Sequence, residues 1–309
     1  MAPKPLCQKT LESFPWMDST RQRWMIQEGN VAVMPCSHCH DTGWRHIAVD
    51  SVAQVERCEC WRKSVAQTLL AAARIPPRYR SCELSTFVTY ENPQLLRALE
   101  RAQRFVESFP VVDKGLLLIG PPGIGKTHIA VSVLRQVILA KNVRGLYYDT
   151  RSLLSTIRST YNPVTRTSEF DVLRPVMEAE LLILDDLGAE RLTDWVEETM
   201  NLIVNTRYND RRPTIFTSNF EDISDPEALE SLLVRVGFRM HSRLREMCDF
   251  LEYTGPDYRD FEFPPSADDL YRTWQSQPRR KLPARASVRA RSGLKSGKPL
   301  GWSGGRAGG

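Results

Sequence analysis

The chain has 309 residues, of which 41% are hydrophobic and 26% charged, a composition typical of a globular protein with one full domain and a smaller one. No apolar run approaches the roughly 18 residues of a membrane span, and the first residues lack the apolar stretch of a secretory signal. These features argue against a membrane-spanning protein, and we expect a cytoplasmic one with no membrane partner.

The net charge of +5 is unevenly distributed. Segment 279–309 holds nine Lys or Arg residues and no acidic one, so residues 1–278 carry a net charge of −4. Because the segment is rich in Gly, Pro and Ser and poor in large apolar residues, it predicts a disordered basic tail within a C-terminal extension, 263–309. The tail is either merely solvated or contacts nucleic acid.

The first motif along the chain is a set of cysteines with the spacing C-x2-C-x18-C-x-C. Its members are Cys36, Cys39, Cys58 and Cys60. Cytoplasmic thiols stay reduced, so the pattern favours metal ligands over disulfides, and four thiolates satisfy Zn²⁺ in a closed structural site. The second pair departs from the commoner C-x2-C, which leaves two alternatives. One is a histidine ligand (His38, His40 or His46), and the other is four separately buried thiols.

Residues 1–62 are expected to form a small zinc-binding module. The stretch between the cysteine pairs is too short to hold a core unaided, and a metal would make it fold. A rigid module ahead of a larger domain is better explained as a docking surface than as a second enzyme. Apolar residues near the start either extend that surface or pack internally. A helical pattern from Trp61 to Ala73 predicts a linker helix, placed at 63–76.

The strongest signal is a phosphate-binding loop that fits G-x-x-x-x-G-K-[ST], between an apolar strand at 116–119 and a helical pattern at about 127–140. Glycines let backbone N–H groups close around phosphates, and this context disfavours a chance glycine-rich turn. Lys126 would contact the β- and γ-phosphates of ATP, and Thr127 would supply a hydroxyl to Mg²⁺. The expected ATP-binding residues are Gly120, Pro121, Pro122, Gly123, Ile124, Gly125, Lys126, Thr127 and His128.

A second apolar strand, 181–184, ends on Asp185 and Asp186. Asp185 is placed to hold Mg²⁺ through water, and Asp186 to polarise the attacking water. Many proteins with these motifs carry Glu at the second position. Aspartate is one methylene shorter, which leaves the hydrolysis rate open but not nucleotide binding.

Three further polar features lie downstream. A third buried strand, 214–219, ends on Asn219, which either caps the strand or reaches the γ-phosphate or its attacking water. Arg239 and Arg243 are four residues apart and share one helix face, where they are either solvated or reach ATP bound by the next subunit. Arg259 follows a short strand at 250–253 and could fold back on the nucleotide.

Together these segments resemble the helicase-loader branch of the AAA+ ATPases, which includes the DnaC and DnaI loaders and the IstB transposition ATPases. The segments that carry the resemblance are GPPGIGKTH, LLILDDLGAE, RYNDRRPTIFTSNF, GFRMHSRLREMC and GPDYR. They occur in the family's order over roughly residues 75–260. The resemblance implies an α/β fold, an AAA+ five-stranded parallel sheet with helices on both faces, as a domain at 77–262 that binds ATP between subunits.

By position the resemblance makes Asn219 similar to sensor 1, Arg243 to the arginine finger with Arg239 in reserve, and Arg259 to sensor 2. It also implies that segment 150–161 is a helix facing single-stranded DNA. Leu153, Leu154 and Ile157 would form the apolar face of this helix, while Arg151 and Arg158 would point elsewhere. A plain amphipathic helix accounts for the same pattern.

The layout predicts an ATPase that self-associates through AAA+ interfaces and loads a hexameric replicative DNA helicase onto single-stranded DNA. DnaI-like loaders carry a zinc-binding N-terminal domain that grips the helicase, and this chain has a similar order of parts. One alternative is an IstB-like transposition helper that acts on duplex DNA. Another is a zinc-dependent adaptor whose ATPase is nearly silent. A small-molecule kinase is least favoured because no substrate lid is recognisable.

Overall fold

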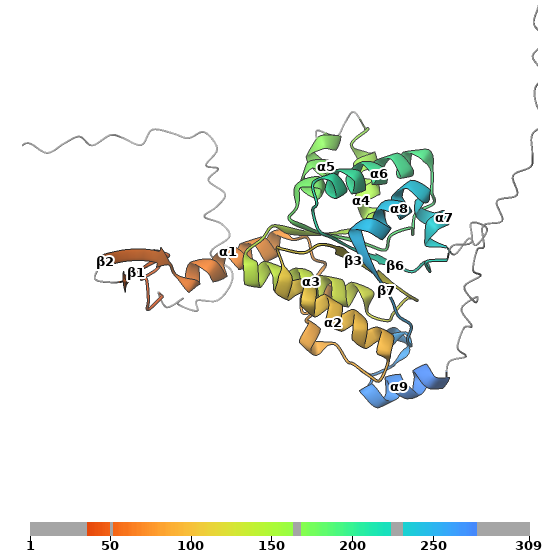
Figure 1. Cartoon of the computed structure of the whole chain (residues 1–309), viewed down its shortest axis with the longest axis horizontal. Helices are drawn as coiled ribbons and strands as arrows, with labels where there is room; N and C mark the ends of the chain where they lie inside the picture. The colour runs from red at the N-terminus through yellow and green to blue at the C-terminus, as the bar shows by residue number, and fades with distance from the viewer. Residues whose placement is uncertain (1–35, 50–51, 163–167, 224–230, 277–309) are drawn as a thin grey trace, which may run out of the picture.

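The computed structural model describes residues 36–49, 52–162, 168–223 and 231–276. The apolar residues near the start and the basic tail lie outside these ranges. A two-stranded hairpin, β1 (Trp44–Val49) and β2 (Val52–Arg57), lies at one end of helix α1 (Glu59–Ala72), and an α/β domain lies at the other (Figure 1). None of the helices in the described ranges is long and apolar enough to cross a membrane.

The α/β domain is built on five parallel strands in the order β4-β5-β6-β3-β7. The strands are β3 (Gly115–Ile119), β4 (Gly145–Asp149), β5 (Leu181–Asp185), β6 (Thr214–Ser218) and β7 (Cys248–Glu252). Every residue of β3, β5 and β6 is buried, as expected for a parallel sheet covered on both faces. The expected AAA+ sheet is therefore confirmed.

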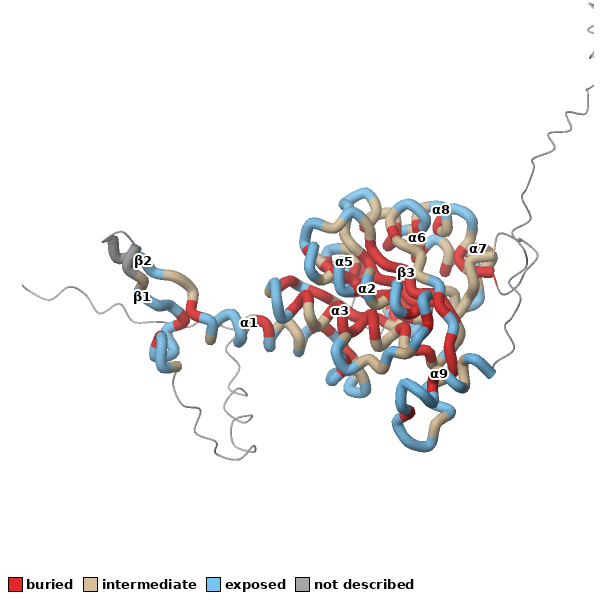
Figure 2. Tube along the Cα trace, turned by 60° about the horizontal axis from the view of Figure 1, so that its bottom comes forward, coloured by how far each residue is buried: buried red, intermediate tan, exposed pale blue. Residues whose placement is uncertain are grey.

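Alternate residues of each strand feed two separate cores. Leu116 and Leu118 pack into one, and Leu117 and Ile119 into the other, because successive side chains point to opposite faces. Helices α2 (Pro93–Ser108) and α3 (Lys126–Lys141) cover the first face. The second face is covered by α4 (Thr150–Ser159), α5 (Glu169–Glu178), α6 (Asp194–Asn209), α7 (Leu232–Val236) and α8 (Phe238–Met247) (Figure 1). The buried residues are concentrated along this sheet (Figure 2).

The described ranges contain four further elements. These are the 3-10 helices η2 (Pro77–Tyr79), η3 (Leu84–Thr86) and η4 (Tyr258–Asp260), and the last described helix, α9 (Ala267–Ser276). Helix α1 begins at Glu59 and ends at Ala72, so it starts before both the helical pattern at Trp61 and the linker helix placed at 63–76, and it ends before residue 76. The residue after its end is bonded to the edge strand of the sheet. The Ala73 carbonyl accepts the backbone N–H of Tyr147 in β4 at 2.9 Å. The hairpin is thus connected to the sheet through one continuous helix.

A buried arginine fastens the second layer of helices to the sheet. Arg207 in α6 is 1% exposed, and its Nε donates to Thr214 Oγ1 at 2.8 Å. Its Nη1 donates to the carbonyl oxygens of Val176, Met177 and Ala179, at 3.0, 3.2 and 2.9 Å. Burial lowers the pKa of Arg207 to about 9. The hydrogen bonds offset the cost of burying this charge and fix the end of α5 beside β6.

Candidate functional site

The loop between β3 and α3 requires glycine at positions where a side chain would collide. Gly123 has φ +77°, and a Cβ there would lie 1.7 Å from Oδ1 of Asp257. Gly125 has φ +92°, and a Cβ there would lie 2.5 Å from the ring of Phe87. Gly125 directly precedes α3 and has no side chain to cap it, so N–H groups of the first turn are left for a ligand. A helix start of this kind suits phosphate.

Lys126 lies at the bottom of this loop and is 6% exposed. Its Nζ donates to the carbonyls of Gly120 and Pro121, at 2.8 and 2.7 Å, and to Oδ1 of Asn219 at 2.7 Å. Burial lowers the pKa of Lys126 to about 8, against the opposing attraction of Asp186. The ammonium group is therefore held in place before any phosphate arrives.

Asp185, at the end of β5, accepts hydrogen bonds from three hydroxyl groups. Thr127 Oγ1 lies 2.9 Å from Oδ1, Thr217 Oγ1 lies 2.5 Å from Oδ1, and the Tyr147 hydroxyl lies 2.7 Å from Oδ2. Thr127 and Asp185 bring together a hydroxyl and a carboxylate oxygen, the kind of ligand that Mg²⁺ takes. This donor set fits the ion, and Tyr147 and Thr217 are contacts that the sequence analysis missed.

Asp186 adopts a left-handed conformation with φ +59°, a region that aspartate tolerates better than most residues. Its backbone N–H donates to Thr217 Oγ1 at 2.9 Å, and its carboxylate accepts a hydrogen bond from Nδ2 of Asn219. Burial, and next the charge of Asp185, raise the pKa of Asp186. Asn219 therefore bridges Lys126 and Asp186, with its oxygen toward the base and its nitrogen toward the acid.

These residues line one cleft with a volume of about 630 Å³. Arg259 also lines it, and its Nε donates to Asp257 Oδ1 at 3.1 Å. The lining of the cleft also includes His128 and the aromatic and apolar side chains of Tyr79, Phe87, Tyr90 and Leu270. Leu270 comes from α9, which the sequence analysis did not connect with the site. The cleft thus offers both charged and apolar side chains, which suit the phosphates and the base of ATP.

The two candidate finger arginines are not part of this cleft. Arg239 and Arg243 lie on α8, and Nη1 of Arg243 donates to the Arg239 carbonyl at 3.1 Å. Neither is among the residues that line the cleft of their own chain. The structure therefore brings Lys126, Asp185 and Asn219 together and leaves both arginines elsewhere on the domain.

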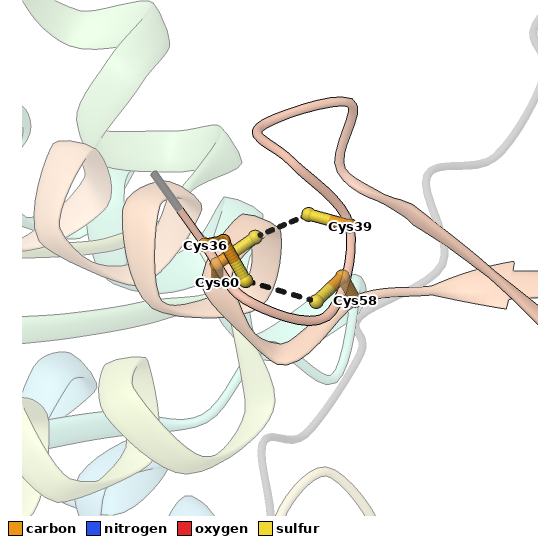
Figure 3. Close-up of side chains that lie close together, drawn as sticks. All are labelled: Cys36, Cys39, Cys58 and Cys60. Atoms are coloured by element: carbon orange, nitrogen blue, oxygen red, sulfur yellow. Dashed lines mark hydrogen bonds between the residues drawn. The ribbon is translucent and has the colours of Figure 1, made fainter. Parts of the chain in front are cut away.

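The four cysteines of the N-terminal motif converge on one point (Figure 3). The Sγ atoms of Cys36 and Cys58 are 3.8 Å apart, those of Cys39 and Cys60 are 3.2 Å apart, and all four lie within 4.8 Å of one another. A tetrahedral zinc with Zn–S bonds of about 2.3 Å places its sulfurs about 3.8 Å apart, so the geometry fits this ion. Among the described residues, no histidine belongs to this group.

The unusual C-x-C spacing follows from the local backbone. Cys58 precedes α1, and its N–H donates to the Gly43 carbonyl at 3.0 Å, while Cys60 lies in the first turn of the helix. The first pair lies on a tight turn, in which the His40 N–H donates to the Cys36 carbonyl at 2.8 Å. A strand end, a turn and a helix start therefore surround the cluster.

The sequence model of the family described as IstB-like ATP binding protein matches residues 47–252, about two thirds of the chain. This chain belongs to that family. The IstB-like proteins are ATP-binding AAA+ proteins, in agreement with the strand order and with the cleft.

Individual relatives include helicase loaders. The chain is 26% identical to the uncharacterized protein YqaM of Bacillus subtilis (strain 168) over 203 residues, and 27% identical to the replicative helicase loader DnaC of Escherichia coli (strain K12) over 172 residues. These matches cover 62% and 55% of this chain. They cover 61% and 66% of the two relatives, which is less than two thirds of their length.

A solved structure of a DnaC helicase loader is also similar. It is 34% identical with a TM-score of 0.51, and the match covers 57% of this chain and 99% of that one. This IstB-like chain is therefore a DnaC-like or IstB-like ATP-binding protein.

Proposed function

We propose that this IstB-like protein is an ATPase that loads a hexameric replicative DNA helicase onto single-stranded DNA. The observation that carries the proposal is the coupling of two parts. A four-cysteine module is built on the first turn of α1, and the other end of α1 is bonded to β4 beside the nucleotide cleft. The DnaC loaders among its relatives support the choice of partner.

In this proposal ATP binds with its phosphates between the start of α3 and Asn219. Lys126 gives up its contacts with the loop carbonyls and contacts the β- and γ-phosphates, which its position under the loop allows. Thr127 and Asp185 would hold Mg²⁺, which when bound would supply positive charge to the phosphates. Asp186 accepts a hydrogen bond from the attacking water, and Asn219 orients the γ-phosphate next to it.

Hydrolysis in this proposal needs a neighbouring copy of the chain. Arg243 does not line its own cleft, so it is free to act as an arginine finger on the nucleotide of the next subunit. Arg259 lines its own cleft and would contact the nucleotide from the side of η4. ATP would then control self-association, because each interface would contain one nucleotide.

The module and α4 supply the two macromolecular contacts. The zinc-loaded cysteine module, residues 1–62 in the sequence-based division, would dock on the helicase. On α4, the buried Leu153, Leu154 and Ile157 form the expected apolar face, which leaves Arg151 and Arg158 directed away from the core, and these would face DNA.

A second candidate function is a transposition helper that acts on duplex DNA. The family description favours it, because the matched model is that of the IstB-like proteins. A zinc-dependent adaptor with a nearly silent ATPase is the third candidate, since Asp186 stands where many related ATPases have Glu.

Native mass spectrometry of the chain with the replicative helicase from the same source separates these candidates. We expect a complex with wild type that is lost when residues 1–58, which precede α1, are removed. Removal of residues 277–309 is the matched control and should leave the complex intact. A chain that binds duplex DNA but never the helicase would favour the transposition helper. A zinc-dependent complex whose nucleotide is not hydrolysed would favour the adaptor.

A further inference from the structure

In the four-cysteine module, one arginine side chain lies close to two tryptophan rings. The guanidinium carbon of Arg57 lies 3.7 Å from the ring centroid of Trp44 and 4.2 Å from that of Trp61. Trp44 and Arg57 are directly opposite each other in the β1–β2 ladder, and Trp61 lies in the first turn of α1. Three elements therefore contribute to one cation–π stack.

The cysteine cluster fixes the position of this stack. Gly43 has φ +74°, and a Cβ there would lie 3.3 Å from Cδ1 of Trp61, so the glycine lets the indole pack on the turn. The Gly43 carbonyl accepts the N–H of Cys58, and the Cys58 carbonyl accepts the N–H of Trp61 at 3.1 Å. A metal held by Cys58 and Cys60 would thus hold Trp61 against Arg57.

The stack is open to a partner at its edge. Trp44 is 44% exposed and Trp61 is 37% exposed. Within the described residues the Arg57 guanidinium has no hydrogen bond or ion pair, whereas the nearby Arg45 is paired with Glu56. Both indole rings lie within 4.2 Å of its guanidinium carbon, while its N–H groups make no hydrogen bond within the described residues. A planar fork of this kind matches a carboxylate with two parallel hydrogen bonds.

We propose that the Trp44–Arg57–Trp61 stack is the centre of the surface with which the zinc module docks on its protein partner, and that it binds an Asp or Glu side chain flanked by apolar groups. The inference rests on the proposed function, since the partner there is the helicase. Tryptophan and arginine are among the residue types enriched in binding hot spots.

The charge of the module favours a protein carboxylate over a nucleic-acid phosphate. Residues 36–62 contain three arginines and four acidic residues, and four thiolates with one Zn²⁺ add two further negative charges. Nucleic-acid surfaces are recognised by clusters of basic residues, which this module lacks. A single arginine that is held by contact with two indole rings is instead suited to one carboxylate.

The test compares full-length wild type with Arg57→Lys, which keeps the charge and loses the planar fork. Arg62→Lys is the matched control, because Arg62 is an exposed arginine of the same module, in α1. Arg57→Gln is measured in parallel, and the variants that retain the wild-type zinc content are compared. Affinities are measured for the replicative helicase of the same source and for a single-stranded oligonucleotide.

We expect Arg57→Lys to raise the Kd for the helicase at least tenfold, with Arg62→Lys within twofold of wild type and oligonucleotide binding the same in all. A zinc-loaded Arg57 variant that binds the helicase like wild type would overturn this inference and leave the proposed function standing. A loss confined to the oligonucleotide would overturn it in favour of a phosphate ligand. Absence of any wild-type complex with the helicase would overturn the proposed function and this inference together.

Discussion

Tyr147 contacts the end of α1 and the nucleotide cleft at the same time. Its hydroxyl donates a 2.7 Å hydrogen bond to Oδ2 of Asp185, and its backbone N–H donates to the Ala73 carbonyl at 2.9 Å. The residue is 6% exposed, so water does not replace either bond easily. A displacement of α1 by a partner of the module would therefore be transmitted to Asp185 through one side chain.

Tyr147→Phe tests this contact. The substitution removes one hydroxyl donor to Asp185 and keeps the ring, so we expect the fold to be retained. Groups that orient metal ligands typically contribute about 10–100-fold to metal affinity, so the Mg²⁺ concentration needed for tight ATP binding should rise by about tenfold. The measurement is a nucleotide titration at several Mg²⁺ concentrations.

The adjacent tyrosine provides a control for this variant. Tyr148 is also buried, but it packs into the opposite core and its ring lies 4.9 Å from the Arg74 guanidinium. Tyr148→Phe should leave the Mg²⁺ requirement unchanged. Equal behaviour of the two variants would show that the Tyr147 hydroxyl does not orient Asp185.

The charged centre of the cleft could be predicted because each of its members follows a recognisable local pattern. Lys126, Asp185 and Asn219 each lie at or shortly after the end of a buried apolar strand, and parallel strands place their carboxyl ends at one edge of the sheet. The convergence of the four cysteines could be predicted for a similar reason, since two close pairs of reduced thiols are typical of a metal site.

The supporting contacts could not be predicted from local patterns. Tyr147 and Thr217 lie inside strands, and their contact with Asp185 depends on β4 and β6 both being neighbours of β5 in the required register. Arg207 lies in a helix between polar residues, where a solvated arginine is the usual outcome, and only the tertiary packing buries it. The helical pattern begins two residues later than α1 does, because Glu59 and Cys60 at its start carry no apolar periodicity.

The low pKa of Lys126 predicts a pH dependence of ATP binding. Burial lowers this pKa to about 8, so the free protein loses the positive charge as the pH rises through 8, whereas bound phosphates would raise the pKa again. ATP affinity should therefore be highest below pH 8 and fall between about pH 8 and 9.5, with a slope approaching tenfold per pH unit. Titrations with a fluorescent ATP analogue over this range measure it, and a flat profile would contradict the prediction.

The low pKa of Lys126 also affects the stability of the nucleotide-free protein, which should rise with pH while ATP affinity falls. The unfolded chain, with a lysine pKa of 10.5, binds more protons than the folded chain between pH 8 and 10.5, so the free energy of unfolding should rise with pH in that window. The difference in pKa corresponds to about 3 kcal/mol. Denaturant unfolding at about pH 7.5 and 9.5 covers about 1.5 pH units of this window, so wild type should gain about 2 kcal/mol between them. Lys126→Met should lack this gain.

The cysteine cluster predicts that the protein contains zinc and that loss of this zinc leaves ATP binding unchanged. Wild type should contain about one zinc per chain. Cys58→Ser should lose it, while ATP affinity stays within twofold because α1 packs on α3 through residues distant from the metal. Cys248→Ala is the control, since Cys248 is buried at the start of β7 and should not affect zinc content. A folded wild-type chain without metal would refute the zinc module.

The position of Arg243 predicts that its substitution impairs ATP hydrolysis between subunits but not ATP binding. Arg243→Ala should bind ATP like wild type, because the side chain does not line its own cleft, and lose concentration-dependent hydrolysis by a factor on the order of 10³. Loss of hydrolysis in Arg239→Ala alone would assign the role to Arg239 instead.

Mixing two inactive variants tests the same role in trans. Lys126→Ala has a disabled cleft and an intact Arg243, whereas Arg243→Ala has an intact cleft and lacks the arginine. In a mixed assembly, each interface that pairs the intact cleft with the intact arginine is complete, so the mixture should hydrolyse ATP although neither variant does so alone. Because Arg243 belongs to α8 and Lys126 to α3 of the same chain, restored activity can come only from contact between different subunits. A mixture as inactive as its components would assign Arg243 a role within its own chain.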